Sequence, residues 1–425
     1  MLTMRYLTLK TRLLALLLLA ATCAAAQTTP AEIAARPELS AGIYHSYEYL
    51  PGPAVPVPAG YEPFYISHYG RHGSRYHASE KAYAEPLAML RKAAEAGKLT
   101  PKGQEVLAKV EALAEDAHLR YGDLSPRGAA EHRGIAERMY AAWPGVFSTD
   151  GGRVCRVESR STLVPRCILS MAAFNERLKE LNPAITTTRD ASERYIDYMA
   201  RGNSMMLVRK AIAAVADSLS RARLNPDRLV RSLVTDPRSV GEPLKLMQGL
   251  YMLTAIIQDV SHLGIEPFYD IFTDEELYTL WECENALRYM QMGPSARFGD
   301  PIVADAGALL RNIVETADAV VRGESDLAAS LRFGHDTCIT PLLALLGVEG
   351  ASARVESPDD IAASWNAQTV TPMATNIQFV FFRNPSTGDV RVRVLHNERD
   401  ARLPIPGAPY YPWKELKKYC ESLYE

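Results

Sequence analysis

The chain is poor in three features: cysteine, excess positive charge and long apolar runs. It has 425 residues, 6 cysteines and a formal net charge of −3. A chain with this charge balance lacks the basic surface typical of nucleic-acid-binding proteins, so no nucleic-acid partner is expected. After the N-terminal leader, no apolar run reaches the roughly 20 residues that a membrane-spanning helix needs, so no transmembrane segment is expected.

The cysteine pattern argues against a zinc site, because no Cys-X-X-Cys pair occurs. Beyond the leader an odd number of cysteines remains. Cys155 and Cys167 could form a bridge in an oxidising compartment, but a chain of this length does not need a disulfide to fold. The sequence therefore favours buried free thiols at positions 155, 167, 283, 338 and 420.

The first residues have the pattern of an export signal. Basic residues precede a short apolar run over residues 13–19, and small residues follow up to Ala26. This pattern predicts a signal peptide cleaved after Ala26, and hence a soluble protein in the periplasm or outside the cell. Lipid attachment at Cys23 is the weaker alternative, because Thr22 is a poor residue before the cleaved bond.

The hydrophobic content of 47% is enough for a large core and more than one lobe. Strand patterns alternate with helical patterns at both ends of the chain, and the middle looks almost wholly helical. We therefore predict an α/β fold in which helices flank a central, mostly parallel sheet and an all-helical cap is inserted. The expected segments are the signal peptide over 1–26, the core over 27–179 and 301–425, and the cap over 180–300.

Arg71-His72-Gly73-Ser74-Arg75 is the most informative stretch, and it follows a strand-like run. Such a string is expected by chance in on the order of one chain in a thousand of this length. Two permanent cations beside a neutral imidazole suit the binding of a phosphate dianion while the ring attacks phosphorus. Gly73 would leave room for close approach to the phosphate. A solvated basic turn is the alternative.

Two more charged clusters follow predicted strands, the segment 160–166 and His335-Asp336. Ligands of open α/β sheets bind beyond the carboxyl ends of strands, so the three clusters are expected to meet in one crevice. Arg166 and His335 would then join Arg71 and Arg75 as phosphate donors. Alternatively, Arg166 could pair with Glu158 or Glu176, and His335-Asp336 could be a surface pair.

The leaving alcohol needs a proton, and Asp336 is the best-placed general acid, which would later activate water. The surrounding cations should lower the pKa of both Asp336 and His72. An acid of low pKa works best in an acidic medium, so the sequence predicts an acidic rate optimum.

Other residues are assigned more loosely. His68 and His72 are four apart and could form a metal pair on a helix, but the local pattern is strand and loop. No carboxylate or Cys is close by, so no metal is expected. His77 and His132 are interpreted as surface histidines, and Arg160 is a less certain pocket residue. Basic residues of the predicted cap could contact distal phosphates or form solvated helix faces: Arg189, Arg194, Arg201, Arg209 and Lys210.

Together these motifs resemble the histidine acid phosphatases, a branch of the histidine phosphatase superfamily that includes phytases and multiple inositol polyphosphate phosphatases. The flanks, residues 58–68 and Asn397-Glu398, look like the bacterial inositol-polyphosphate-type members. The resemblance implies no cofactor and no metal. It implies His72 as the phosphorylated nucleophile, Asp336 as the proton donor, and a phosphate site made of Arg71, Arg75, Arg166 and His335.

The chain departs from that family pattern at two points. It reads Arg75-Tyr76-His77 where the family often has proline, and His335-Asp336-Thr337 where the inositol polyphosphate group has His-Ala-Glu. The expected function is an exported phosphomonoesterase acting on a small phosphate ester, preferably phytate or a related inositol phosphate. The alternatives are a broad-specificity acid phosphatase on sugar or nucleotide phosphates, or a binding protein without turnover, which would not need Asp336.

Overall fold

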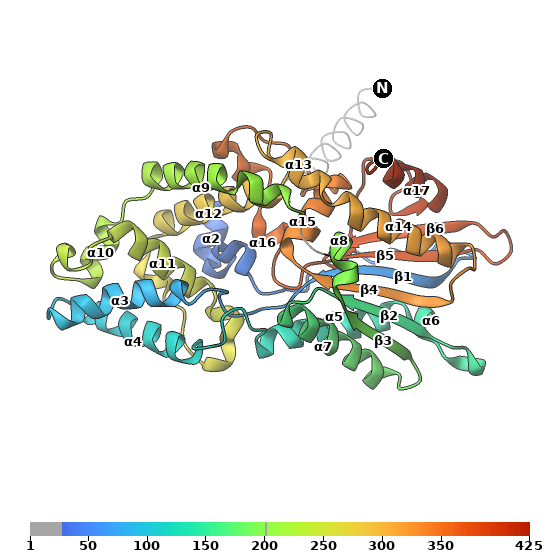
Figure 1. Ribbon diagram of the computed structural model, residues 1–425, viewed down its shortest axis with the longest axis horizontal. Helices are drawn as coiled ribbons and strands as arrows, with labels where there is room; N and C mark the ends of the chain where they lie inside the picture. Colours follow the sequence, from blue (N-terminus) through green and yellow to red (C-terminus); the bar gives the residue numbers. More distant parts are fainter. Residues whose placement is uncertain (1–27, 200–201) are drawn as a thin grey trace, which may run out of the picture.

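The computed structural model of the protein describes residues 28–199 and 202–425. The predicted signal peptide and Cys23 lie outside the described residues. A sheet at one end of the molecule adjoins a group of helices at the other end (Figure 1). Within the described residues, none of the helices has the length and apolar character needed to cross a membrane.

One mixed sheet forms the core, with the strand order β3-β2-β4-β1-β5-β6-β7 and with β8 paired to β6. The strands β3, β2, β4 and β1 are parallel to one another, and the remaining pairs are antiparallel. The bounds are β1 Glu62–Arg71, β2 Arg156–Ser161, β3 Thr186–Ala191, β4 Leu327–Gly334, β5 Asn376–Arg383, β6 Val390–His396, β7 Arg399–Asp400 and β8 Tyr410–Pro412.

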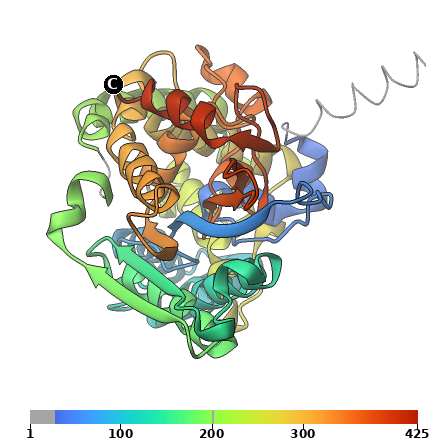
Figure 2. The same cartoon turned by 90° about the vertical axis from the view of Figure 1, so that its right-hand side faces the viewer.

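Helices cover both faces of this sheet, as the view along it shows (Figure 2). One layer packs Phe174 and Met139 against Ile66 and Phe333 of the sheet. This layer consists of α5 (Pro126–Ala142), α6 (Pro144–Phe147) and α7 (Pro165–Leu181). The opposite layer consists of α14 (Gly307–Val321), α15 (Asp336–Leu345) and α17 (Trp413–Glu421). The central strands β1, β4 and β5 thus bury both of their faces, which is typical of α/β folds.

The second group of helices forms the cap, and it comes from two parts of the chain. Helices α3 and α4, which precede β2 in sequence, pack against α11 and α10, which follow β3. The cap helices are α3 Lys81–Glu95, α4 Pro101–Asp116, α9 Ser204–Arg223, α10 Asp227–Leu233, α11 Pro243–Ala255 and α12 Asp274–Met292. Short helices complete the fold: α2 Pro30–Ala35, α8 Ile196–Met199, α13 Gly299–Ala304 and α16 Ala367–Val370.

The α/β class, the flanking helices and the free thiols are confirmed, the last by five buried, unbridged cysteines. One expectation is wrong. The segment over 180–300, expected to be all-helical, contains the strand β3, whose polar, half-exposed residues carry no apolar signal.

The turn after β1 packs directly on the start of α5. A Cβ on Gly73 would lie 2.3 Å from the carbonyl oxygen of Gly128, and a Cβ on Gly128 would lie 2.2 Å from that of Ser74. The hydroxyl of Ser125, which caps α5, donates to the Ser74 carbonyl at 3.0 Å. The space left by Gly73 is therefore filled by backbone, not by a ligand as the sequence suggested.

Gly128→Ala should lower the free energy of unfolding by about 1–3 kcal/mol, because neither backbone can yield to the added methyl group. Urea unfolding followed by circular dichroism measures this loss. Gly145→Ala is the control: its Cβ would meet only ordinary contacts at 3.6 and 3.7 Å. Equal stability of the two variants would contradict the backbone contact.

Candidate active site

The three charged clusters follow β1, β2 and β4, which lie side by side in the order β2-β4-β1. Because these strands are parallel, their carboxyl ends meet at one edge of the sheet. The backbone N–H of His72 donates to the carbonyl of Gly334 at 2.9 Å, and that of Thr162 donates to Phe333 at 3.1 Å. The clusters are thus tied together by the same ladder that builds the sheet.

His72 is fully buried, and its ring is poised with one nitrogen deprotonated. Nδ1 lies 3.0 Å from the carbonyl oxygen of Gly73. A carbonyl can only accept, so Nδ1 carries the hydrogen and the neutral ring keeps the lone pair of Nε2. Burial holds the pKa of His72 well below its usual value, and Arg71, Arg166, Arg75 and His335 lower it further. Burial and these charges therefore favour the neutral ring.

Arg71 is buried between two carbonyl oxygens and one carboxylate. Its Nη1 donates to Ile43 at 2.7 Å and to Thr371 at 2.8 Å. Its Nη2 lies 3.1 Å from Oδ2 of Asp336, whereas Nε has no hydrogen-bond partner. Burial alone would raise the pKa of Asp336, but Arg71, His335, Arg75 and Arg288 together lower it to about 2.

Arg75 and Arg166 supply two more buried donors. Nη1 of Arg75 donates to the Tyr76 carbonyl at 2.7 Å, and the Nε atoms of both arginines have no hydrogen-bond partner. Arg166 lies in the first turn of α7. Burial, followed by the charge of Arg75, lowers the pKa of Arg166, while the nearby Asp336 carboxylate opposes the shift.

His335 precedes α15 and faces His72. The two ring centroids are 5.8 Å apart, with the planes at 73°. Its Nε2 lies 3.2 Å from the hydroxyl of Thr162, and its backbone N–H donates to the hydroxyl of Tyr69 at 3.2 Å. The next residue, Asp336, accepts from the Thr337 backbone N–H at 2.8 Å.

Arg75, Arg166, His335 and Asp336 border a cavity of about 650 Å³ between the sheet edge and the cap. Its cationic part includes Arg75 and Arg166 from the core and Arg209 and Arg288 from the cap. Its remaining wall is largely apolar and is lined by Ile43, Leu163, Val164, Ile196, Met199, Met205, Met206 and Met292.

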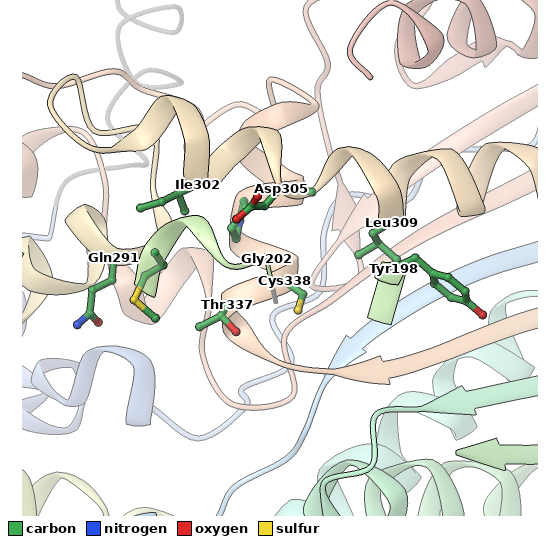
Figure 3. Close-up of a pocket in the computed structure, with 11 residues that line it drawn as sticks. Tyr198, Gly202, Gln291, Ile302, Asp305, Leu309, Thr337 and Cys338 are labelled. Atoms are coloured by element: carbon green, nitrogen blue, oxygen red, sulfur yellow. The ribbon is translucent and has the colours of Figure 1, made fainter. Parts of the chain in front are cut away.

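The cap side of this cavity depends on how α9 begins. Asp305 accepts from the backbone N–H and the hydroxyl of Ser204, both at 2.9 Å. A Cβ on Gly202 would overlap Asp305, so the chain passes the carboxylate at backbone distance. Figure 3 shows Gly202 beside Asp305, next to Thr337 and Cys338 of α15. This contact anchors the helix that carries Met205, Met206 and Arg209 into the cavity.

The model of the histidine phosphatase superfamily (branch 2) matches residues 70–397. The chain belongs to this family. The match spans all three charged clusters and all of the cap helices, and it makes the protein a phosphomonoester hydrolase. No curated protein gives a significant match.

Solved structures agree with the family fold at low sequence identity. The multiple inositol polyphosphate phosphatase of Bifidobacterium longum, in complex with inositol hexasulfate, has a TM-score of 0.75 and 20% identity, covering 89% of this chain and 96% of that one. The phytase of D. castellii has a TM-score of 0.63 and 15% identity, covering 91% and 84%. The phytase of Citrobacter braakii has a TM-score of 0.52 and 13% identity, covering 86% and 98%.

The structure brings together all six residues that the sequence assigned to the site. Arg166 does not pair with Glu158 or Glu176, since Glu158 pairs with Arg160 and Glu176 with Arg133. Arg160 instead donates to the hydroxyl of Tyr198 at 2.7 Å and does not line the cavity.

Of the basic cap residues considered from sequence, Arg209 lines the cavity, whereas Arg189, Arg194 and Lys210 do not. Arg201 lies outside the described residues. The expectation that His77 and His132 are surface histidines is wrong, because both are buried. Nε2 of His77 contacts the carbonyl of Met252 at 3.0 Å, and His132 packs against Phe333.

Sequence reasoning missed Arg288 and Tyr44. Arg288 lies on α12, and its Nη2 pairs with Glu284 at 2.5 Å, while its guanidinium faces the Tyr44 ring at 5.9 Å. Arg75 faces the same ring at 5.4 Å. The signal available in the sequence was the i, i+4 spacing of Glu284 and Arg288, which favours an ordered guanidinium on a helix.

His68, four residues before His72, packs among aromatic rings instead of binding a metal. Its ring lies 5.4 Å from Phe174 and 5.5 Å from Phe333. Neither ring nitrogen has a hydrogen-bond partner. Over residues 28–199 and 202–425, no cluster of three or more His, Cys, Asp or Glu could hold a metal ion.

We expect His68→Leu to make the protein less sensitive to acid. Burial, with the charges of His132 and Arg332, lowers the pKa of His68 to about 3. The unfolded chain therefore takes up a proton near pH 6.5 that the folded chain refuses, and stability is lost as pH falls below that value. The free energy of unfolding of the variant, relative to that of the parent, should be about 3 kcal/mol higher at pH 4 than at pH 7.

Chemical unfolding of both proteins between pH 7 and 4 measures this recovery. His118→Leu, at an exposed histidine, is the control for loss of an imidazole. If His68→Leu loses as much stability on acidification as the parent protein, the neutral buried imidazole is not present.

Proposed function

We propose that the protein is an exported phosphomonoesterase that works through a phosphohistidine at His72. The main support for this proposal is that an uncharged, buried imidazole lies beside three arginines whose Nε atoms have no hydrogen-bond partner. Arg71, Arg75, Arg166 and His335 would hold the phosphate dianion. Export rests on the charged, apolar and small-residue pattern of residues 1–26.

In the first step, Nε2 of His72 forms a bond to phosphorus and the ester oxygen departs as the alcohol, taking the proton of Asp336. In the second step, the Asp336 carboxylate accepts a proton from water, whose oxygen attacks the phosphohistidine and releases inorganic phosphate. In the absence of substrate, Asp336 has a pKa of about 2. A phosphate dianion beside it would raise that value and so favour the acid form. This supports a rate optimum in acid.

The favoured substrate is phytate or another inositol polyphosphate. Support comes from the relatives of known structure, which include an inositol polyphosphate phosphatase and phytases. A polyphosphate needs cations beyond one phosphate site, and Arg288 and Arg209 line the same cavity from the cap.

A broad-specificity acid phosphatase, acting on sugar or nucleotide phosphates, is the second candidate. The apolar half of the cavity wall favours it, because four methionines line that half. Methionine side chains are flexible and fit leaving groups of varied shape. A highly charged leaving group gains nothing from such a wall.

The roles of His72 and Asp336 predict different defects. His72→Ala should lose turnover by at least about 10³-fold, because the nucleophile is gone. Asp336→Asn should lose about 10²–10⁴-fold with an alkyl phosphate but far less with p-nitrophenyl phosphate, whose leaving group departs without a proton. Steady-state kinetics at pH 5 measure both.

A loss that is equal for both esters would remove Asp336 from the role of acid. Hydrolysis by His72→Ala at the parent rate would overturn the phosphohistidine mechanism. Rapid quenching also tests for the intermediate directly, because a phosphate bound to histidine is released in acid.

Arg288→Met should raise the KM for phytate about tenfold, because one charged donor is lost, and should change that for p-nitrophenyl phosphate little. Arg194→Met, outside the cavity, is the matched control. Phosphate release is measured with phytate, glucose phosphate, a nucleoside monophosphate and p-nitrophenyl phosphate. Turnover of the simple esters alone would remove the inositol phosphate assignment and leave the mechanism intact.

A further inference from the structure

Behind the turn that carries His72, four side chains form a buried cluster that the proposed mechanism does not use. Ser74 lies in the turn, Glu131 on α5, Ser46 in the segment before β1, and Asp259 in the 3₁₀ helix Ile257–Leu263 of the cap. All four are buried. The cluster thus links the core, the cap and the turn between Arg71 and Arg75.

The hydroxyl oxygens of Ser74 and Ser46 lie 3.1 Å apart, and three shorter contacts join them to the two carboxyl groups. The hydroxyl of Ser74 lies 2.7 Å from Oε1 of Glu131 and 2.8 Å from Oδ1 of Asp259. The hydroxyl of Ser46 lies 2.7 Å from the same Oδ1. Each contact needs one hydrogen, but the two hydroxyls carry only two between them. A third hydrogen must therefore sit on a carboxyl group.

The remaining contacts decide which carboxyl carries it. Oε2 of Glu131 accepts from the backbone N–H of Ser74 at 2.8 Å, and Oε1 accepts from that of Tyr47 at 2.9 Å. Both oxygens of Glu131 thus face backbone donors, which suits a carboxylate. Oδ2 of Asp259 is buried and has no partner. A second anion with one bare oxygen would be costly at this depth.

We propose that Asp259 is a protonated positioning residue, whose Oδ1–H donates to Ser74, while the Ser74 hydroxyl donates to the Glu131 carboxylate and so fixes the turn that carries His72. The Ser46 hydroxyl completes the set by donating to Oδ1 of Asp259. Each short contact then has one donor and one acceptor. The chain of hydrogen bonds runs from the cap through the turn into α5.

The charges around Asp259 agree with this assignment. Burial, followed by the negative charge of Glu131, raises the pKa of Asp259 to about 8, while Arg75 opposes the shift. Arg71 at the end of β1 and Tyr269 of the cap also face it. Arg127, whose Nε is 3.8 Å from Oε1 of Glu131, favours the carboxylate there. A single negative charge behind the turn leaves most of the field of Arg71 and Arg75 to the phosphate.

The assignment sets the sign of a pH effect. A free aspartic acid has a pKa of about 4, so the unfolded chain loses this proton between about pH 4 and pH 8 while the folded chain keeps it. The stability due to Asp259 is complete below about pH 4 and is lost as pH rises to 8. Asp259→Asn keeps a donor and an acceptor but cannot titrate.

The first experiment compares unfolding temperatures of Asp259→Asn and the parent protein between pH 4 and 8. The unfolding temperature of the variant, relative to that of the parent, should rise steadily with pH. Asp318→Asn is the matched control, because that carboxylate accepts from Lys417 and Arg322 at 2.7 Å and should lose stability on neutralisation. A difference that does not change with pH, or a variant that falls behind as pH rises, overturns the proposal.

Infrared difference spectra identify the proton directly, with or without turnover. The parent minus Asp259→Asn spectrum at pH 6.5 should contain the C=O stretch of a protonated carboxylic acid. If this band survives in Asp259→Asn and vanishes in Glu131→Gln, the proton belongs to Glu131 and the assignment is wrong.

Kinetics with p-nitrophenyl phosphate at pH 5 test the positioning role. Asp259→Ala and Glu131→Gln should lower kcat at least tenfold with a smaller change in KM, because the turn loses its support. The Gln side chain would set an amide N–H₂ against a backbone N–H. Asp259→Asn should rescue more than half of the parent kcat. Equal losses in Asp259→Ala and Asp259→Asn would show that a charge is needed there, contrary to the proposal.

Discussion

The burial of Arg71 is the constraint on which the site depends. Its guanidinium is removed from water and is held by two carbonyl oxygens and by the Asp336 carboxylate at 3.1 Å. Burial lowers the pKa of His72 and the charge of Arg71 lowers it further, whereas the same charge lowers the pKa of Asp336 against the effect of burial. One buried cation thus favours both the uncharged imidazole and the ionised carboxylate, since its field disfavours a positive charge and favours a negative one.

The backbone around the turn provides the rigidity that such a site needs. Gly73 and Gly128 let the turn and the start of α5 approach at backbone distance, and the Ser125 cap closes the contact. Glu131 and Ser125 hold the N–H, the hydroxyl and the carbonyl of Ser74 from one side. Asp259 supports the same hydroxyl from the cap. The turn is therefore held on both sides, and the arginines beside it need few partners of their own.

The cavity combines two kinds of lining. The core contributes Arg75, Arg166 and His335. The cap contributes Arg209 and Arg288 on one side and much of an apolar wall on the other. The contact of Asp305 with Ser204 fixes the start of the helix that carries part of that wall. In the function we propose, the sheet edge would carry out the hydrolysis and the cap would select the substrate.

The sequence by itself determined the class of fold, the turn from Arg71 to Arg75, and the residues Arg166, His335 and Asp336. These signals are local, because each is a short string directly after a strand whose pattern is readable. The tertiary structure alone decided the roles of Arg288, Glu131 and Asp259. Asp259 is 185 residues from Ser74, and a contact over that distance leaves no periodicity or spacing in the chain. The same holds for the buried His77 and His132, whose surroundings exist only once the layers pack.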